Sequence, residues 1–256
     1  MRPIILSIAG SDSSGGAGIQ ADIKTITVQG GYAASVITAV TAQNTLGVQS
    51  IYAIPDHEII TQICSVKNDL EIQSVKTGML TSKAIIEYIA TEFSDTKLVV
   101  DPVMVATSGD VLIGEDVTES IKSKLLPVAT LVTPNIYEAE ILTGIKINNE
   151  DDQIAAAEKL IEKGCKNVLV KGGHGKGNKI TNVLISGNTH IFKHEKISTN
   201  NTHGTGCTLA SSIATKLAFG NSLRDACNDS IDYILMLLKN SPKLGKGNGP
   251  LMHNLS

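Results

Sequence analysis

The chain has 256 residues, of which 42% are hydrophobic and 3% aromatic, and its net charge is −3 at neutral pH. This length and hydrophobic content are sufficient for one large α/β domain. The 22 basic and 25 acidic residues exclude the strongly basic surface typical of nucleic-acid binders, and a sequence without Trp is a poor base-stacking platform.

Strand-like and helix-like segments alternate from the N-terminus onward. The apolar run 4–9 is too short to span a membrane and is interpreted as a buried first strand. Helical periodicity follows over 19–29, and a run rich in β-branched residues at 34–40 predicts the second strand. The same alternation then predicts helices at 58–70, 83–93, 117–126 and 153–163 and short buried strands at 75–77, 98–100, 131–133 and 168–170.

The C-terminal third contains a predicted β-hairpin over 181–194, with Ser186-Gly187-Asn188 as its turn, followed by helices near 205–219 and 223–239. No linker or internal repeat interrupts the chain, so residues 1–256 are predicted to form one domain. We expect an α/β fold with a doubly wound, mostly parallel sheet flanked by helices and an antiparallel hairpin at one edge.

The four cysteines, Cys64, Cys165, Cys207 and Cys227, have neither C-x-x-C spacing nor the spacing of a zinc site. Free thiols in a reducing cytoplasm are therefore expected. The N-terminal segment also lacks the pattern of a signal peptide, and the sequence predicts no association with a membrane.

Polar and Gly-rich segments follow the predicted strands. They lie at 9–18, 41–44, 77–79, 101–104, 133–135 and 171–173. In doubly wound sheets, ligands bind at the carboxyl ends of the strands, so these segments are expected to converge on one binding site.

The sharpest motif is Gly204-Thr205-Gly206-Cys207, which opens a predicted helix. The first N–H groups of a helix lack intrahelical partners, and the helix dipole makes that end positive. The motif therefore predicts an anion hole for a transferring phosphoryl group, with Cys207 as a thiolate base because thiol pKa values fall at helix N-termini. The alternative is an ordinary Gly-rich loop with Cys207 as a small core residue.

The loop 10–18 is a weaker signal. The chain has no G-x-x-x-x-G-K-[ST] motif, and this loop does not match G-x-G-x-x-G, which disfavours P-loop NTPases and dehydrogenases. Asp12, Asp22 and the backbone amides of the loop are expected to hydrogen-bond a small polar ligand. The alternative is a flexible connector.

Asn135 and Glu138 lie one helical turn apart, where they could hold Mg²⁺ through water or form a helix capping box. Both interpretations stay open. Lys171 ends a buried strand and needs a partner, either a phosphate or a carboxylate.

Together these motifs resemble the hydroxymethylpyrimidine/phosphomethylpyrimidine kinases of thiamine biosynthesis, within the ribokinase-like superfamily. The resemblance is carried by AGSDSSGGAGIQAD at 9–22, TAVTAQNT at 38–45, KTGM at 76–79, DPVMV at 101–105, TPNIYEAE at 133–140, VKGGH at 170–174 and THGTGCT at 202–208. It departs at Asn248, where the family pattern leads us to expect His, and this leaves the detail of the C-terminal segment open.

The resemblance implies a ribokinase-like fold, ATP and Mg²⁺ as cofactors, and a homodimer. Two successive phosphoryl transfers are implied, first to the alcohol of 4-amino-5-hydroxymethyl-2-methylpyrimidine and then to the monophosphate. By similarity, the pyrimidine site comprises Gly10, Asp22, Gln43, Met79 and Val105. On the nucleotide side, Gly204, Thr205 and Gly206 would form the anion hole, with Cys207 as base, Lys171 steering the phosphates, and Asn135 and Glu138 organising Mg²⁺.

Two rival functions are kept. One is a pyridoxal kinase of the same superfamily, and the other is a non-catalytic relative that binds the metabolite. Residues 106–114, with Gly109 and Gly114, are a candidate lid over the site.

Overall fold

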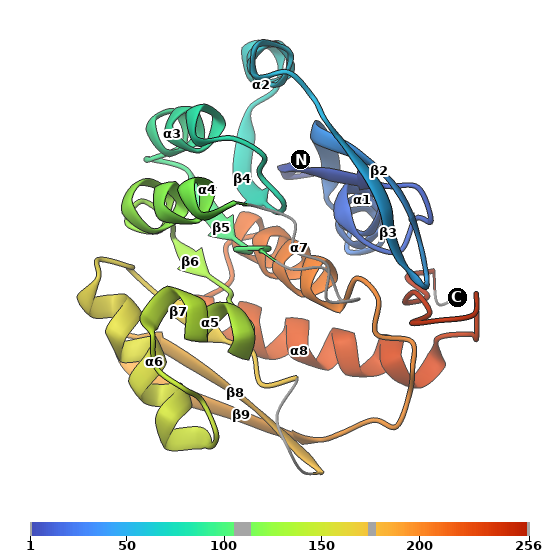
Figure 1. Ribbon diagram of the computed structural model, residues 1–256, viewed down its shortest axis with the longest axis vertical. Coiled ribbons are helices and arrows are strands. Elements are labelled where there is room, and N and C mark those ends of the chain that lie inside the picture. The colour runs from blue at the N-terminus through green and yellow to red at the C-terminus, as the bar shows by residue number, and fades with distance from the viewer. Residues whose placement is uncertain (1, 105–113, 174–177, 255–256) are drawn as a thin grey trace.

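The computed structural model describes residues 2–104, 114–173 and 178–254, which fold around one nine-stranded sheet (Figure 1). The strands lie in the order β3-β2-β1-β4-β5-β6-β7-β8-β9. All pairs from β2 through β7 are parallel, and β3, β8 and β9 are antiparallel to their neighbours. The strands are β1 Ile4–Asp12, β2 Tyr32–Asn44, β3 Gly47–Ala53, β4 Ile72–Thr77, β5 Lys97–Val100, β6 Leu131–Val132, β7 Val168–Val170, β8 Lys179–Ser186 and β9 Asn188–Glu195.

Helices cover both faces of the sheet, as the sequence predicts. They are α1 Gly18–Val28, α2 Asp56–Asp69, α3 Lys83–Glu92, α4 Glu115–Ser120, α5 Ile136–Thr143, α6 Glu150–Glu162, α7 Thr205–Ala218 and α8 Leu223–Asn240. One face packs against α2 to α6 and the other against α1, α7 and α8, so two hydrophobic clusters form (Figure 1). This double coverage explains why β5 to β7 contain short apolar runs without alternation.

The predicted antiparallel hairpin at one edge is confirmed as β8 and β9. Ser186 pairs with Asn188 around Gly187, whose φ of +72° suits the glycine that the turn requires.

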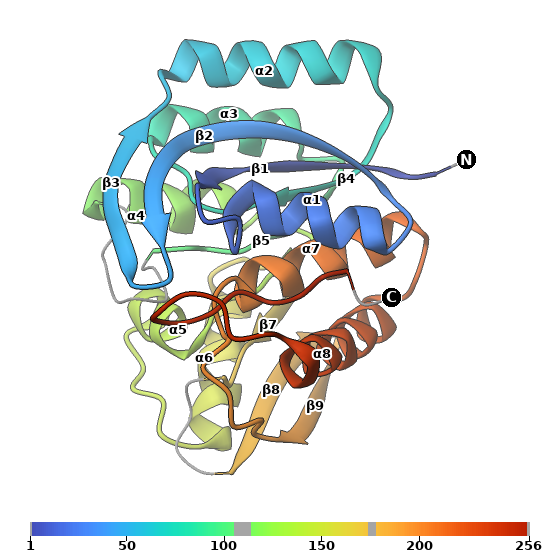
Figure 2. The same cartoon turned by 90° about the vertical axis from the view of Figure 1, so that its right-hand side faces the viewer.

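A second antiparallel pair, β2 with β3, was not predicted. Residues 41–44 were expected to follow the second strand, but they are part of β2. They pair with β3 up to the end of the hairpin, where Asn44 of β2 lies opposite Gly47 of β3. Most of β3 is exposed, so it lacks the buried apolar run that marks the other strands. Figure 2 shows β2 curving away from the centre of the sheet with β3 beside it.

Three helical segments refine the predictions. The helix expected at 117–126 is α4 followed by a π-helical segment, Ile121–Leu125. The short helix α5 was anticipated only at its capped start, and α7 begins at Thr205 as predicted. Within residues 2–104, 114–173 and 178–254, no helix has the length and apolar character that crossing a membrane requires.

Candidate active site

One cavity of about 740 Å³ lies at the carboxyl ends of the parallel strands. The sequence-predicted residues that line it come from both halves of the chain, which confirms the expected convergence of the strand ends. They are Gly10, Gln43, Met79, Asn135, Glu138, Lys171, Gly204, Thr205, Gly206 and Cys207.

The phosphate side of the cavity is the N-terminus of α7. Gly204 caps the helix in the left-handed conformation, with a φ of +80°. In the part of the chain that the structure describes, no protein acceptor receives the N–H groups of Gly206 and Cys207. The hydroxyl of Thr205 donates to the carbonyl oxygen of Thr202 at 3.0 Å and so stabilises the loop itself. These free N–H groups, at the positive end of a 14-residue helix, form a site suited to an anion.

The pKa of Cys207 differs from the sequence prediction. Burial raises the pKa of the thiol to about 11, although the ammonium of Lys76 and a hydrogen bond from the Gly18 N–H oppose this effect. The carboxylates of Asp22 and Asp101 raise it further. The expectation of a thiolate was therefore wrong for the unliganded protein: the helix end favours the charged sulfur, but loss of hydration outweighs it.

Lys171 has a carboxylate partner in this structure. Its Nζ donates to Asp101 Oδ1 at 2.7 Å, and the backbone N–H of Lys171 donates to the carbonyl oxygen of Pro134 at 2.8 Å. Burial alone would lower the pKa of Lys171, but the charges of Asp101 and Glu138 outweigh burial and raise it. The lysine is thus fixed in its charged form beside the cavity.

Asn135 and Glu138 form the capping box that the sequence allowed. The Asn135 side chain accepts from the Glu138 N–H at 2.9 Å, and Glu138 Oε2 accepts from the Asn135 N–H at 2.8 Å. Burial raises the pKa of Glu138 to about 7, against the lowering effect of Lys171.

The capping box limits how these residues could hold a metal ion. One oxygen of each side chain already caps α5, so direct chelation through those two oxygens would compete with the cap. The buried Glu138 carboxyl still has lone pairs for a water ligand, which suits Mg²⁺ because it keeps several waters. The described residues contain no group of three His, Cys, Asp or Glu side chains placed to bind a metal. The fit to Mg²⁺ is therefore through water.

The opposite side of the cavity is built by β1, β2 and the residues after β4. The Gln43 side-chain oxygen accepts from the Thr41 hydroxyl at 3.0 Å, which leaves its amide NH₂ group for a ligand. Met79 packs against Gly10 so closely that a Cβ at Gly10 would lie 3.1 Å from the Met79 methyl group. A side chain at position 10 would therefore require the Met79 methyl group to move by a few tenths of an ångström.

Asp22 does not line the cavity, contrary to its expected contact with substrate. Its side chain is fully buried between α1, β4 and α7. Hydroxyls of Ser7 and Ser211 donate to it, each at 2.6 Å, and Lys76 Nζ lies 2.8 and 2.9 Å from its two oxygens. Burial disfavours the Lys76 charge, but the Asp22 carboxylate outweighs burial and raises the pKa of Lys76. Asp22 thus has a structural partner in place of a ligand.

Two further sequence predictions lie outside the described residues. They are the packing of Val105 on the ring and the candidate lid at 106–114, of which only Gly114 is described.

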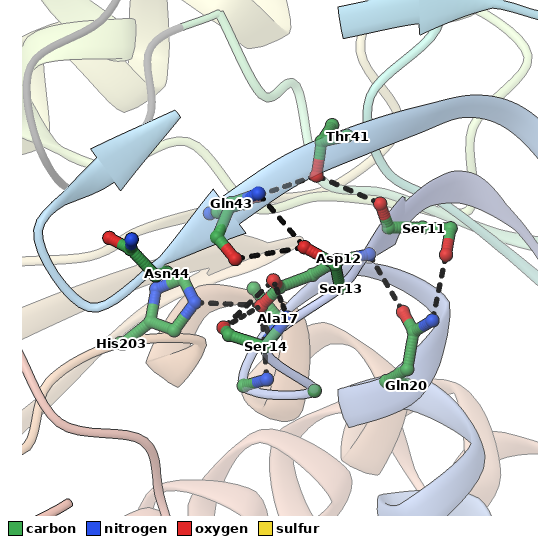
Figure 3. Close-up of polar contacts among 12 residues, drawn as sticks. Ser11, Asp12, Ser13, Ser14, Ala17, Gln20, Thr41, Gln43, Asn44 and His203 are labelled. Carbon is green, nitrogen blue, oxygen red and sulfur yellow. Dashed lines mark hydrogen bonds and ion pairs between the residues drawn. The ribbon is translucent and has the colours of Figure 1, made fainter. Parts of the chain in front are cut away.

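Two further residues contribute to the site, although no individual role is predictable for them from the sequence. Asp101 Oδ1 accepts from Lys171 Nζ. Nε2 of His203 lies 2.8 Å from Asp12 Oδ2, as Figure 3 shows. The available signals were that Asp101 directly follows a predicted strand and that His203 directly precedes Gly204. The partner contacts join segments distant in sequence, so spacing alone could not identify them.

Comparisons with known proteins find relatives over nearly the whole chain. The profile of the family described as phosphomethylpyrimidine kinase matches residues 12–252. The hydroxymethylpyrimidine/phosphomethylpyrimidine kinase of Streptomyces coelicolor is 42% identical, over 98% of this chain and 94% of that protein. The thiamine biosynthesis bifunctional protein ThiED of Geobacter sulfurreducens is 47% identical, and the chain spans 53% of its length.

Solved structures give the same result for the fold. The phosphomethylpyrimidine kinase of Clostridium difficile is 42% identical, with a TM-score of 0.81 over 92% of this chain and 99% of that one. The pyridoxal kinase of Bacillus subtilis, in an ADP complex, is 33% identical, with a TM-score of 0.91 over 99% and 98%. These neighbours confirm the ribokinase-like fold. On the family match and the near-complete coverage, the chain belongs to the phosphomethylpyrimidine kinase family.

Proposed function

We propose that the chain transfers the γ-phosphoryl group of ATP to the alcohol of 4-amino-5-hydroxymethyl-2-methylpyrimidine and then phosphorylates the monophosphate, as a step of thiamine biosynthesis. The single observation that carries this proposal is one cavity with an anion hole at Gly204–Cys207 on one side and Gln43 with Met79 on the other. The names of relatives matched over almost their whole length support the substrate. The name of the bifunctional protein of Geobacter sulfurreducens supports the pathway.

The pyrimidine lies, in this proposal, between Gln43 and Met79. The free amide group of Gln43 suits hydrogen bonding to an aminopyrimidine edge, and Met79 and Gly10 supply an apolar wall and a close backbone approach. The hydroxymethyl group then points towards the N-terminus of α7.

The phosphoryl group is held by the N–H groups of Gly206 and Cys207 together with the ammonium of Lys171. These donors are fixed in position before the reaction, so they stabilise the charge that develops in the transition state. ATP use is supported by neighbours solved with ADP or AMP-PCP. Mg²⁺, held through water by Glu138 and Asn135, would neutralise phosphate charge when bound.

The two transfers place different demands on Cys207. In the first, only the thiolate form of Cys207 can act as base: it takes the alcohol proton as the alcohol oxygen bonds to phosphorus and ADP leaves. In the second, the acceptor phosphate is already anionic and needs positioning more than a base. The Cys207 pKa of about 11 already includes the lowering effect of the Lys76 ammonium, so only a small thiolate fraction is available as base at neutral pH.

Pyridoxal phosphorylation is the second candidate function. Pyridoxal kinases of Bacillus subtilis and Staphylococcus aureus share the fold at 31–33% identity. The higher identity, 42%, to the Clostridium difficile phosphomethylpyrimidine kinase favours the pyrimidine.

One experiment tests these functions in parallel. ADP formation is measured with hydroxymethylpyrimidine, its monophosphate and pyridoxal at equal low concentration. We expect kcat/KM to be highest for the two pyrimidines. Faster turnover of pyridoxal would select the second function, and no substrate-dependent ADP would select the non-catalytic binding protein.

The setting of the protein is also part of the proposal. All four cysteines are free thiols, which supports a reducing cytoplasm. Large apolar side chains exposed on β2 and β3 support a homodimer, among them Val40 at 46%, Ile51 at 40% and Tyr52 at 67% exposed. Light scattering coupled to size exclusion measures the oligomeric state, and a monomer at micromolar concentration would contradict the dimer.

A further inference from the structure

The carboxylate of Asp12 is the centre of the loop that follows β1 (Figure 3). It accepts from the N–H of Ser14 at 2.8 Å, of Gly16 at 3.0 Å and of Ala17 at 2.8 Å. The fourth side of the carboxylate faces His203, whose Nε2 lies 2.8 Å from Oδ2. Both side chains are buried, Asp12 at 2% and His203 at 5% exposed. This carboxylate has no capacity left for a ligand.

His203 is held at its backbone as well as at its ring. It directly precedes Gly204, and its N–H donates to the carbonyl oxygen of Gly249 in the C-terminal segment at 3.0 Å. The loops also touch: a Cβ on Gly16 would lie 2.3 Å from the His203 ring, and one on Gly204 would lie 1.8 Å from the Gly16 carbonyl oxygen. The two loops are therefore in close contact at both glycines, and neither position could accept a side chain without moving them apart.

The same loop carries the substrate side of the cavity. The Ser13 hydroxyl donates to the carbonyl oxygen of Gln43 and accepts from its N–H, both at 2.9 Å. A continuous set of contacts thus runs from Gln43 through Asp12 to His203 and on to the anion hole. In-line phosphoryl transfer needs the acceptor oxygen and phosphorus aligned within a fraction of an ångström. The contacts between the two loops therefore control this alignment, and with it the rate.

We propose that His203 is a positioning residue, which holds the pyrimidine-side loop against the phosphate-side helix end through its hydrogen bond to Asp12. The inference rests on the proposed kinase function for its effect on rate, but the connection between the loops exists independently of any substrate. It predicts that losing the bond misaligns two sites that each still bind their own ligand.

The test compares three variants. His203→Leu removes the donor at similar volume, and His203→Gln keeps an amide donor near the Nε2 position. His253→Leu is the matched control: His253 is also buried and bonds Thr208 at 2.9 Å, but among the described residues its side chain makes no hydrogen bond to the loop after β1.

We expect kcat of His203→Leu to fall about 10- to 100-fold, while the dissociation constants of the pyrimidine and of ADP, measured by calorimetry, change less than about threefold. His203→Gln should recover most of kcat, and His253→Leu should lose thermal stability with kcat nearly unchanged. Equal kcat in the wild type and His203→Leu, or equal losses in His203→Leu and His253→Leu, would overturn the inference.

A second readout separates this inference from the kinase assignment. Amide hydrogen exchange of residues 10–18 should accelerate at least about tenfold in His203→Leu and stay near the wild-type rate in His253→Leu. If wild-type protein phosphorylates none of the three acceptors, the proposed function fails and exchange alone decides the inference. Unchanged exchange in His203→Leu would then refute the connection between the loops.

Discussion

The ammonium of Lys171 lies 2.7 Å from the carboxylate of Asp101, directly beside the first turn of α7. A Cβ on Gly206 would lie 3.3 Å from Lys171 Nζ and 3.5 Å from Asp101 Oδ2, so the charge pair and the free N–H groups of the helix border the same space. Asp101 keeps the lysine charged and in place, while the helix supplies the directed donors.

Replacing Lys171 with Met should therefore affect nucleotide use first. We expect kcat/KM for ATP to fall about 10- to 100-fold, because a hydrogen bond between charged groups contributes roughly 1.5–3 kcal/mol. Steady-state rates at varied ATP measure this. Lys146→Met is the control, since Lys146 pairs with Glu140 at the protein surface. A Lys171→Met enzyme with wild-type kcat/KM would refute the role of the lysine.

The raised pKa of Cys207 predicts a particular pH dependence of its alkylation. With a pKa of about 11, the thiolate fraction grows about tenfold per pH unit between pH 7 and 9.5, and the iodoacetamide rate at Cys207, followed by peptide mass spectrometry, should grow with it. A plateau already at pH 8 would mean that the helix end outweighs burial after all.

Cys207→Ala should damage the first transfer more than the second, since only the neutral alcohol needs a base. We expect the rate with the alcohol to fall about 100-fold and that with the monophosphate less than tenfold. Product assays with each acceptor measure both. Cys64→Ser, remote from the cavity lining, should leave both rates unchanged. Equal losses in both transfers would show that Cys207 positions phosphate and does not act as a base.

Local patterns predicted those parts of the site that are formed by neighbouring residues. The start of α7 at Thr205 and the capping box of α5 depend on residues within one turn of each other, and both were recognisable in the sequence. The convergence of strand ends followed from the repeated β-α order, which fixes the direction of parallel strands.

The contacts that could not be predicted join distant segments or depend on burial. Lys76 and Asp22 are 54 positions apart, and His203 and Asp12 are 191 apart. A sequence shows that Asp22 is a carboxylate near a Gly-rich loop, but only packing decides whether it faces the ligand or a buried lysine. The prediction of a thiolate at Cys207 failed for the same reason. Its position at a helix start is visible in the local sequence, but its loss of hydration depends on residues that are distant in the sequence.

The Lys76–Asp22 pair gives a stability prediction. Lys76→Met leaves a fully buried carboxylate without its cation and should lower the free energy of unfolding by about 3–5 kcal/mol. Adding Asp22→Asn to that variant removes the unpaired charge and should recover about 2 kcal/mol. Urea denaturation measures both, with the exposed Lys83→Met as a control expected to change less than about 1 kcal/mol. A double variant less stable than Lys76→Met would contradict this account.

The lowered pKa of Asp12 predicts that the free energy of unfolding falls in acid. Burial raises its pKa, but bonds from His203, Ser14 and Ala17 lower it from 3.8 to about 2. A group with a lowered pKa stabilises the fold above its unfolded value and loses that contribution as pH falls through the folded value. The stability advantage of wild type over Asp12→Asn should thus shrink by about 2 kcal/mol between pH 6 and pH 2. Urea titrations at both pH values measure it, and an advantage that stays constant would refute the linkage.

Two neighbouring glycines should separate folding from function. Gly206 has no left-handed φ, and an added Cβ at 3.3 Å would need only a small shift of the flexible Lys171 Nζ, so Gly206→Ala should fold within about 1 kcal/mol of wild type. Its new methyl group would lie where the phosphoryl group must approach the N–H donors, and kcat should fall about 100-fold or more. Gly204→Ala should instead unfold readily, because position 204 combines a φ of +80° with a clash against Gly16.

The control for the backbone strain at Gly204 is Gly144→Ala. Gly144 has nearly the same φ, +78°, but no atom within 4 Å of an added Cβ, so this substitution should cost only the left-handed strain of about 1–2 kcal/mol. Thermal unfolding of the three variants, alongside their rates of ADP formation, gives both quantities. Gly204→Ala should be clearly less stable than Gly144→Ala, because it adds the loop contact to the same backbone strain. Equal stability of these two would mean that the two loops can separate without cost, and a fully active Gly206→Ala would remove the anion hole from the mechanism.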